Sequence, residues 1–140
     1  MSVTQDSARS SAPAGRTAHP AFSALVGLAS LGVLLQALWA GLFVHEGEEY
    51  EESWVHVHAL GGEITIALAA VATVVAFVTM RRRRKDLVVG AAALTVVLVL
   101  EAYIGGLIGA HSALTALHFP LAMALMGLAV WLPLRARGRA

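Results

Sequence analysis

The histidines are the residues of this sequence whose type and spacing could do chemistry. His58 and His118 fall inside long apolar segments, where ionisable side chains are rare and usually face the interior of a helix bundle. Imidazole ligates metal ions and haem iron, and two imidazoles that face each other across a bundle can hold such a group. Apart from His19, the other histidines lie at the ends of the same apolar segments: His45, His56 and His111.

The elements that must position these histidines are four apolar segments, at residues 21–44, 57–80, 87–110 and 113–134. Each is long enough to cross a bilayer core as a helix, which takes roughly 20 residues. Of the 140 residues, 58% are hydrophobic and 14% charged, against about 25% charged in a typical soluble domain. The absence of cysteine excludes a disulfide scaffold and any thiolate site. The sequence therefore predicts an all-α, four-helix transmembrane up-down bundle over residues 20–135.

Charge along the chain predicts how this bundle is oriented. All ten Lys and Arg residues lie before the first segment, between the second and third, or after the fourth. By the positive-inside rule, both termini are cytoplasmic and the bundle is a multi-pass protein of the plasma membrane. We interpret Arg81–Arg84 as this topology signal, and expect a lipid bilayer rather than nucleic acid as partner. An acidic loop from His45 to His56 is then external.

The ends of the chain and the remaining connections complete this layout. Residues 1–19 are rich in Ser, Ala, Gly and Pro, and we expect a disordered cytoplasmic tail there. Residues 136–140 form a second short cytoplasmic tail. The turns Arg81–Asp86 and His111–Ser112 are so short that they make consecutive helices antiparallel neighbours.

This layout places His58 and His118 on diagonal helices at depths that differ by about one turn. Gly62 and Ala122 each follow one of these histidines by one turn, and small residues there leave room for a flat macrocycle. His56 points elsewhere, because two residues along a helix correspond to about 200° of rotation. The sequence predicts that His58 and His118 form a pair of imidazoles near the external face that holds a metal or a haem.

Two strings carry a resemblance to a known family. HALGGEITIALAAVATVVAF resembles the second helix of one half of bacterial heme A synthases, and EAYIGGLIGAHSALTALHFPLAMALMGLAVWL resembles the third and fourth helices of such a half. Small uncharacterised actinobacterial four-helix membrane proteins have a similar histidine pattern and a pair equivalent to Gly105–Gly106. The resemblance implies that His58 and His118 are axial haem ligands. It also implies that a homodimer would restore the eight helices of the fused family.

The chain departs from that family in ways that bear on catalysis. It holds one half rather than two, and it lacks the external cysteines of many members. The catalytic half of the family has a glutamate three residues before its second-helix histidine, whereas Val55 precedes His58 and Ser53 precedes His56 at that interval. Haem binding tolerates these differences better than methyl oxidation does. We therefore predict that His58 and His118 ligate the iron of a b-type haem near the external face, for electron transfer or haem handling, and leave the enzyme activity unassigned.

The haem propionates need donors, and the external side has no Lys or Arg to offer. We predict that a protonated His111 donates a hydrogen bond to a propionate. Other donors on that side are His45, His56 and Trp54.

Three further polar residues lie within the apolar segments: Gln36, Glu63 and Glu101. Two interpretations are open for them. They form hydrogen bonds that hold the helices together, or they relay protons or accept a quinol beside a redox centre. Gly105-x-x-x-Gly109 indicates close helix packing, room for a ring edge, or dimerisation.

Two functions other than haem binding also fit the sequence. His45 and the glutamates that follow it could capture a divalent cation, in a metal-binding or transport-associated protein. The chain could instead be a cofactor-free structural subunit of a membrane complex. A quinone or a redox protein is the candidate partner if haem is bound. No motif for nucleotide hydrolysis or common hydrolase chemistry is present.

Overall fold

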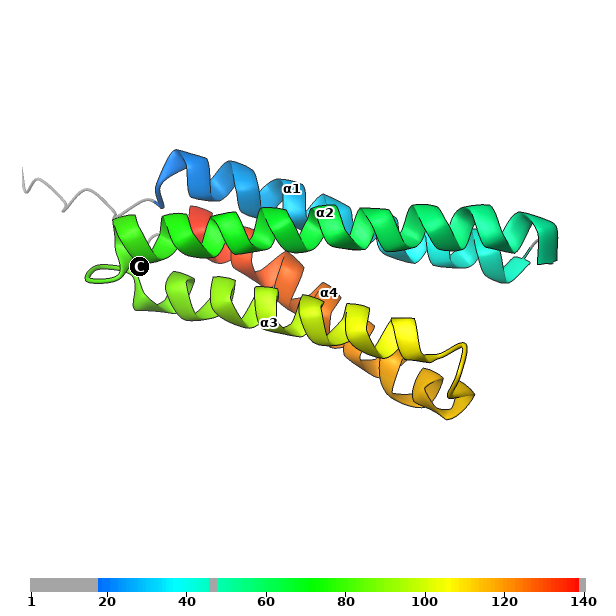
Figure 1. The fold of residues 1–140 in the computed structure, drawn as a ribbon. Helices are drawn as coiled ribbons and strands as arrows, with labels where there is room; N and C mark the ends of the chain where they lie inside the picture. Colours follow the sequence, from blue (N-terminus) through cyan, green and yellow to red (C-terminus); the bar gives the residue numbers. More distant parts are fainter. Residues whose placement is uncertain (1–17, 46–47, 139–140) are drawn as a thin grey trace, which may run out of the picture.

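The protein is a bundle of four long helices in a computed structural model that describes residues 18–45 and 48–138. The helices are α1 (Pro20–His45), α2 (Glu48–Met80), α3 (Lys85–Leu107) and α4 (Thr115–Arg137), and a single 3₁₀ turn, η1 (Ser112–Leu114), precedes α4 (Figure 1). No strand occurs in these ranges. The predicted all-α four-helix bundle is confirmed. The tail prediction for residues 1–17 lies outside the described residues.

All four helices are long and apolar enough to cross a bilayer. Their exposed sides carry large apolar residues along most of their length, among them Leu34, Val74, Val96 and Met123. Such a surface is stable in lipid and unstable in water, because there it would expose apolar area far beyond that of a soluble monomer. The chain is therefore a multi-pass integral membrane protein.

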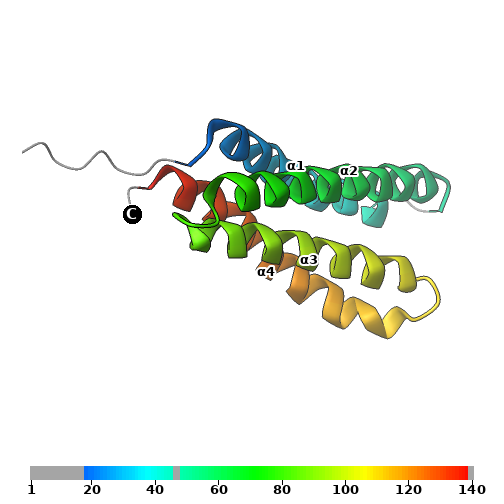
Figure 2. The same ribbon diagram turned by 60° about the vertical axis from the view of Figure 1, so that its left-hand side comes forward.

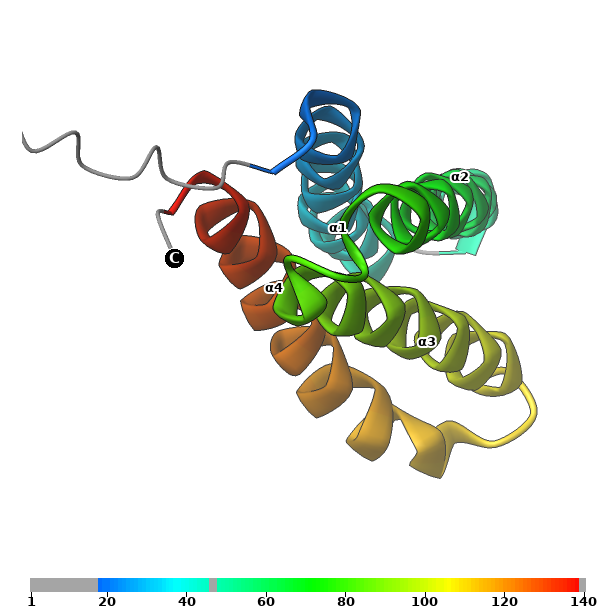
Figure 3. The ribbon, with the colours of Figure 1, turned by 90° about the vertical axis from the view of Figure 1, so that its left-hand side faces the viewer.

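The helices pack in the order of the chain around a closed square. α1 contacts α2, α2 contacts α3, α3 contacts α4, and α4 returns to α1. Figure 2 shows the bundle from a further side, and Figure 3 shows α2 and α4 at opposite corners. Consecutive helices run antiparallel, so the predicted diagonal relationship of α2 and α4 is confirmed.

The apolar core occupies only one half of this bundle. We call the end with the turn between α2 and α3 the arginine end, and the end with the turn between α3 and α4 the histidine end. The last buried apolar residues toward the histidine end are Val33, Ala69, Leu98 and Leu125. Beyond them the α1–α2 hairpin and the α3–α4 hairpin diverge, as both Figure 1 and Figure 2 show.

Small side chains and one hydroxyl bring α1 and α4 together within the core. Pro133 cannot donate the backbone hydrogen bond that the carbonyl of Ala129 would normally accept. The hydroxyl of Ser30 on α1 lies 2.6 Å from that carbonyl oxygen and 2.8 Å from the carbonyl oxygen of Val26. Ser30 therefore satisfies a group that proline leaves open, at a depth where no water can do so.

The prediction of an acidic loop from His45 to His56 is wrong for most of that range. α2 begins at Glu48, ahead of the predicted span that starts at Val57. Glutamate is a strong helix former, and acidic residues in a first turn interact favourably with the helix dipole. The helix therefore continues out of the apolar span.

The helix ends beside the other two turns also differ from the predicted spans. α3 ends at Leu107, before the predicted end at residue 110, because glycines at 105, 106 and 109 weaken the helix there. α4 reaches Arg137, so the predicted tail at 136–140 begins as helix.

Candidate functional site

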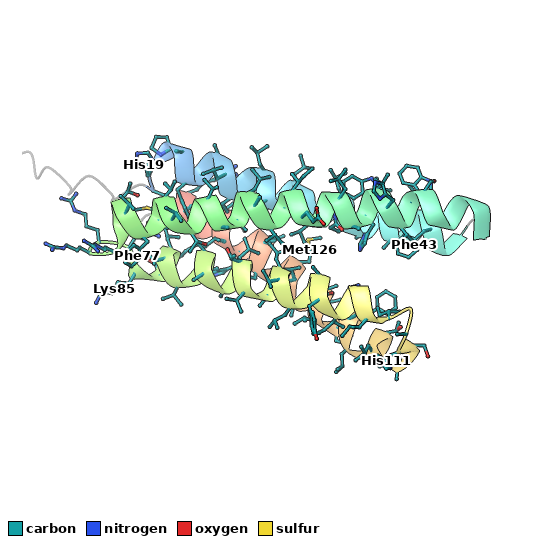
Figure 4. All side chains as sticks on the ribbon, in the orientation of Figure 1. His19, Phe43, Phe77, Lys85, His111 and Met126 are labelled. Atoms are coloured by element: carbon teal, nitrogen blue, oxygen red, sulfur yellow. The ribbon has the colours of Figure 1, made fainter. Side chains whose placement is uncertain are left out.

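His58 lies on α2 at the histidine end and contacts α1. Its Nδ1 is 3.1 Å from the backbone carbonyl oxygen of Gln36. The ring of Phe43 meets the imidazole edge to face, with 5.5 Å between ring centroids. Figure 4 shows Phe43 toward this end of α1. The imidazole of His58 is thus held on two sides by α1.

The side chain of Gln36 strengthens this contact between α1 and α2. With the amide oriented to suit its neighbours, Nε2 of Gln36 lies 2.9 Å from the carbonyl oxygen of His58 and 3.0 Å from its Nδ1. Oε1 of Gln36 then accepts a hydrogen bond from the backbone N–H of Gly62 at 3.0 Å. Gln36 therefore bridges the helical turn that carries His58.

His118 lies on α4, and its partner is on α3. Nδ1 of His118 is 3.2 Å from Oε1 of Glu101. The angles of this contact do not make a hydrogen bond, so Nδ1 and both carboxylate oxygens are buried without one among the described residues. The side chain of Glu101 is only 10% exposed, and the imidazole of His118 lies against it.

The two histidines are thus placed in the same way by different helices. Each turns Nδ1 toward an acceptor on the preceding helix, and neither Nε2 is hydrogen-bonded to another described residue. The two imidazoles lie on α2 and α4, which are diagonal in the bundle. Nδ1 of His118 faces a carboxylate, and the tautomer with its proton on Nδ1 leaves the Nε2 lone pair available to a metal. In His58 the same tautomer donates to the backbone carbonyl of Gln36, and the side-chain amide of Gln36 then donates to the carbonyl oxygen of His58 rather than to Nδ1.

The glycines and the alanine predicted to make room differ in what they contact. A Cβ on Gly105 would lie 3.1 Å from Cε1 of His118, so this glycine makes direct room for the imidazole. Gly106 faces open space on the exposed side of α3. Gly62 lies one turn from His58 on α2 and beside Gln36 of α1, and Ala122 is half-buried.

Gly109 follows the end of α3 and has no neighbour within 4 Å of a Cβ built on it. Its predicted part in close helix packing is therefore not realised between the described helices of this chain.

The remaining polar residues divide between the site and the surface. Glu63 is on the exposed side of α2, and no hydrogen bond or ion pair links it to Gln36 or Glu101. His56 is exposed as well. His111 is exposed at the turn before η1, and Figure 4 shows it at the tip of the histidine end. The side chains of His45 and the glutamates after it lie outside the described residues.

Sequence reasoning missed two aromatic residues of α1 that pack against α2 at or near His58. Trp39 packs against Gly61, where a Cβ would overlap the indole ring, and Phe43 contacts the imidazole itself. Gln36, Trp39 and Phe43 are spaced by three and four residues, which places them on one face of a helix. That spacing could have identified the face of the first segment that meets His58.

Among the described side chains, no group of three or more His, Cys, Asp or Glu is placed to hold a metal ion. No protein-family model, curated protein or solved structure matches this chain.

Proposed function

We propose that this membrane protein holds a b-type haem between His58 and His118 at the histidine end, for electron transfer or haem handling. The observation that carries the proposal is the matched placement of the two imidazoles. Histidines that ligate metals usually donate their other ring N–H to a carbonyl or carboxylate, which fixes the tautomer and orientation of the ring. Gln36 offers the carbonyl to His58, and Glu101 offers the carboxylate to His118.

The distribution of the core supports a ligand at this end. Apolar packing closes the bundle at the arginine end and stops at Val33, Ala69, Leu98 and Leu125. Beyond these residues the two hairpins diverge, and His58 and His118 lie on opposite hairpins. A haem between them would join the two hairpins.

The residues present also fit the polar and steric needs of haem. Gly105 leaves space for the imidazole of His118. Every described Lys and Arg lies at the arginine end, in the turn Arg81–Lys85 or on the last turn of α4. His111, exposed at the histidine end, is then the side chain proposed to face a propionate. Bound haem would supply one-electron chemistry, and the chain would supply its ligands and their orientation.

The location of the protein belongs to the same proposal. The arginine end lies on the cytoplasmic side of the plasma membrane, because loops rich in Lys and Arg are retained on the cytoplasmic side. Electrons would then pass at the outer leaflet, to or from a quinone or a redox protein. The resemblance to one half of the heme A synthases is consistent with a haem site of this kind, and a homodimer would give a pair of such sites.

Absorption spectra of the protein purified in mild detergent test the proposal. We expect a Soret band when oxidised and sharp bands after dithionite reduction, as for two axial imidazoles. His58→Ala and His118→Ala are each expected to weaken haem binding at least about tenfold. His56→Ala is the matched control, because this exposed residue lies two positions before His58 on the same helix, and it should leave the spectrum unchanged.

A rescue experiment separates loss of a ligand from loss of the fold. His118→Gly should regain the sharp reduced bands when imidazole is added to the buffer. A wild-type protein that stays colourless after haem reconstitution would exclude the proposal and favour the structural subunit. A colourless protein whose bound metal depends on His45 would instead support metal capture.

A further inference from the structure

The arginine end carries a hollow that the haem proposal does not use. It lies at the end of α2 and is lined by Val78, Thr79, Arg81, Arg82 and Arg83, with a volume of about 290 Å³. Figure 4 labels Phe77 near the end of α2 and Lys85 at the start of α3, both at this end of the bundle. The hollow therefore combines the last apolar turn of a membrane span with three consecutive guanidinium groups.

The charges in this hollow are not balanced by the described residues around it. Asp86 is the one described carboxylate at the arginine end, and it is already bound by Arg84 and Arg135, at 3.0 and 2.9 Å. Arg84 is itself buried and also donates to the carbonyl oxygen of Arg135. No described carboxylate therefore remains for Arg81, Arg82 and Arg83.

The apolar side of the hollow continues along α2 into the membrane. Val78 and Val74 are 70% and 62% exposed, and they lie one turn apart on the same face. Phe77 is also exposed, and the guanidinium carbon of Arg81 lies 5.2 Å from its ring centroid. A ligand with an anionic head and an apolar chain could satisfy both parts at once.

We propose that this hollow binds the phosphate of an anionic phospholipid, with an acyl chain along Val74 and Val78. Guanidinium groups bind phosphate oxygens through paired hydrogen bonds, in a geometry that lysine cannot reproduce. The apolar track favours a lipid over free phosphate, because free phosphate would leave that half of the site without a partner. This inference is independent of haem.

Native mass spectrometry of the full chain in detergent tests this site with phosphatidylglycerol as the probe and phosphatidylcholine as the neutral reference. Arg82→Gln/Arg83→Gln removes two charges from the hollow. Lys85→Gln/Arg137→Gln is the matched control, because it removes two exposed charges from the same end but outside the hollow. We expect the first variant to bind phosphatidylglycerol at least about tenfold more weakly than the control variant does.

A charge-conserving variant guards against a change in membrane orientation. Arg82→Lys/Arg83→Lys keeps the topology signal and should still lose most of the preference for phosphatidylglycerol. Equal losses in the hollow variant and its control would overturn the proposal in favour of a diffuse basic surface. Displacement of the lipid by millimolar inorganic phosphate would overturn the lipid assignment and leave a phosphate site.

Discussion

At the scale of single residues, the site depends on which ring nitrogen of each histidine faces an oxygen of a neighbouring helix. Glu101 on α3 and the backbone carbonyl of Gln36 on α1 lie at opposite corners of the bundle, and each faces Nδ1 of a histidine. A carboxylate next to an imidazole holds the ring in one orientation, and Gly105 sets how closely α3 can approach that ring. Small changes at these positions should therefore alter haem binding without removing a ligand.

Gly105→Ala is the sharpest such change. Its Cβ would lie 3.1 Å from Cε1 of His118, so the ring must move by a few tenths of an ångström away from its place beside Glu101. We expect roughly a fivefold loss of haem affinity, because inserting a methyl group into a packed contact costs at least about 1 kcal/mol. Gly106→Ala, which faces open space, should bind haem as the wild type does. Equal affinities for the two variants would mean that His118 is not held by this contact.

At the scale of helices, four apolar runs of about 20 residues were enough to predict the number, order and packing partners of the helices. The ends of two helices were not predicted correctly. Helix propensity extends α2 through Glu48–Glu52, and glycines end α3 early. Both histidines and their neighbours Gln36 and Glu101 were identified as candidates. Their pairing was not, because it depends on the rotation of each helix, which nearly uniform apolar segments do not encode.

The contact between α1 and α4 provides a test at this scale. Ser30→Ala removes the hydroxyl that reaches the carbonyl of Ala129, which Pro133 has left without its usual donor. We expect the free energy of unfolding to fall by about 0.5–2 kcal/mol, the range for hydrogen bonds between membrane helices. Ser23 lies about two helical turns before Ser30 on α1, and its side chain makes no hydrogen bond to α4. Ser23→Ala should therefore change the free energy of unfolding little. Thermal or denaturant unfolding in detergent would measure the stability of both variants. If Ser30→Ala is as stable as Ser23→Ala, the carbonyl of Ala129 finds another donor.

At the scale of the whole molecule, the two ends of the bundle have opposite character. The arginine end is closed by an apolar core and by the contacts of Arg84, Asp86 and Arg135. Among the described residues, no large apolar side chain is buried at the histidine end, which carries both imidazoles. If the positive-inside rule sets the orientation, then the proposed haem lies toward the outer leaflet and the proposed lipid site lies toward the cytoplasm.

This orientation can be read directly, because the chain has no cysteine of its own. Ser112→Cys places a thiol at the exposed turn of the histidine end, and Gly138→Cys places one at the exposed arginine end. In intact cells, we expect a membrane-impermeant thiol reagent to label Ser112→Cys alone, and permeabilised cells to label both. The reverse pattern would put the histidine pair on the cytoplasmic side, where a haem would exchange electrons with cytoplasmic partners. Labelling of both variants in intact cells would mean that the arginine run does not fix a single topology.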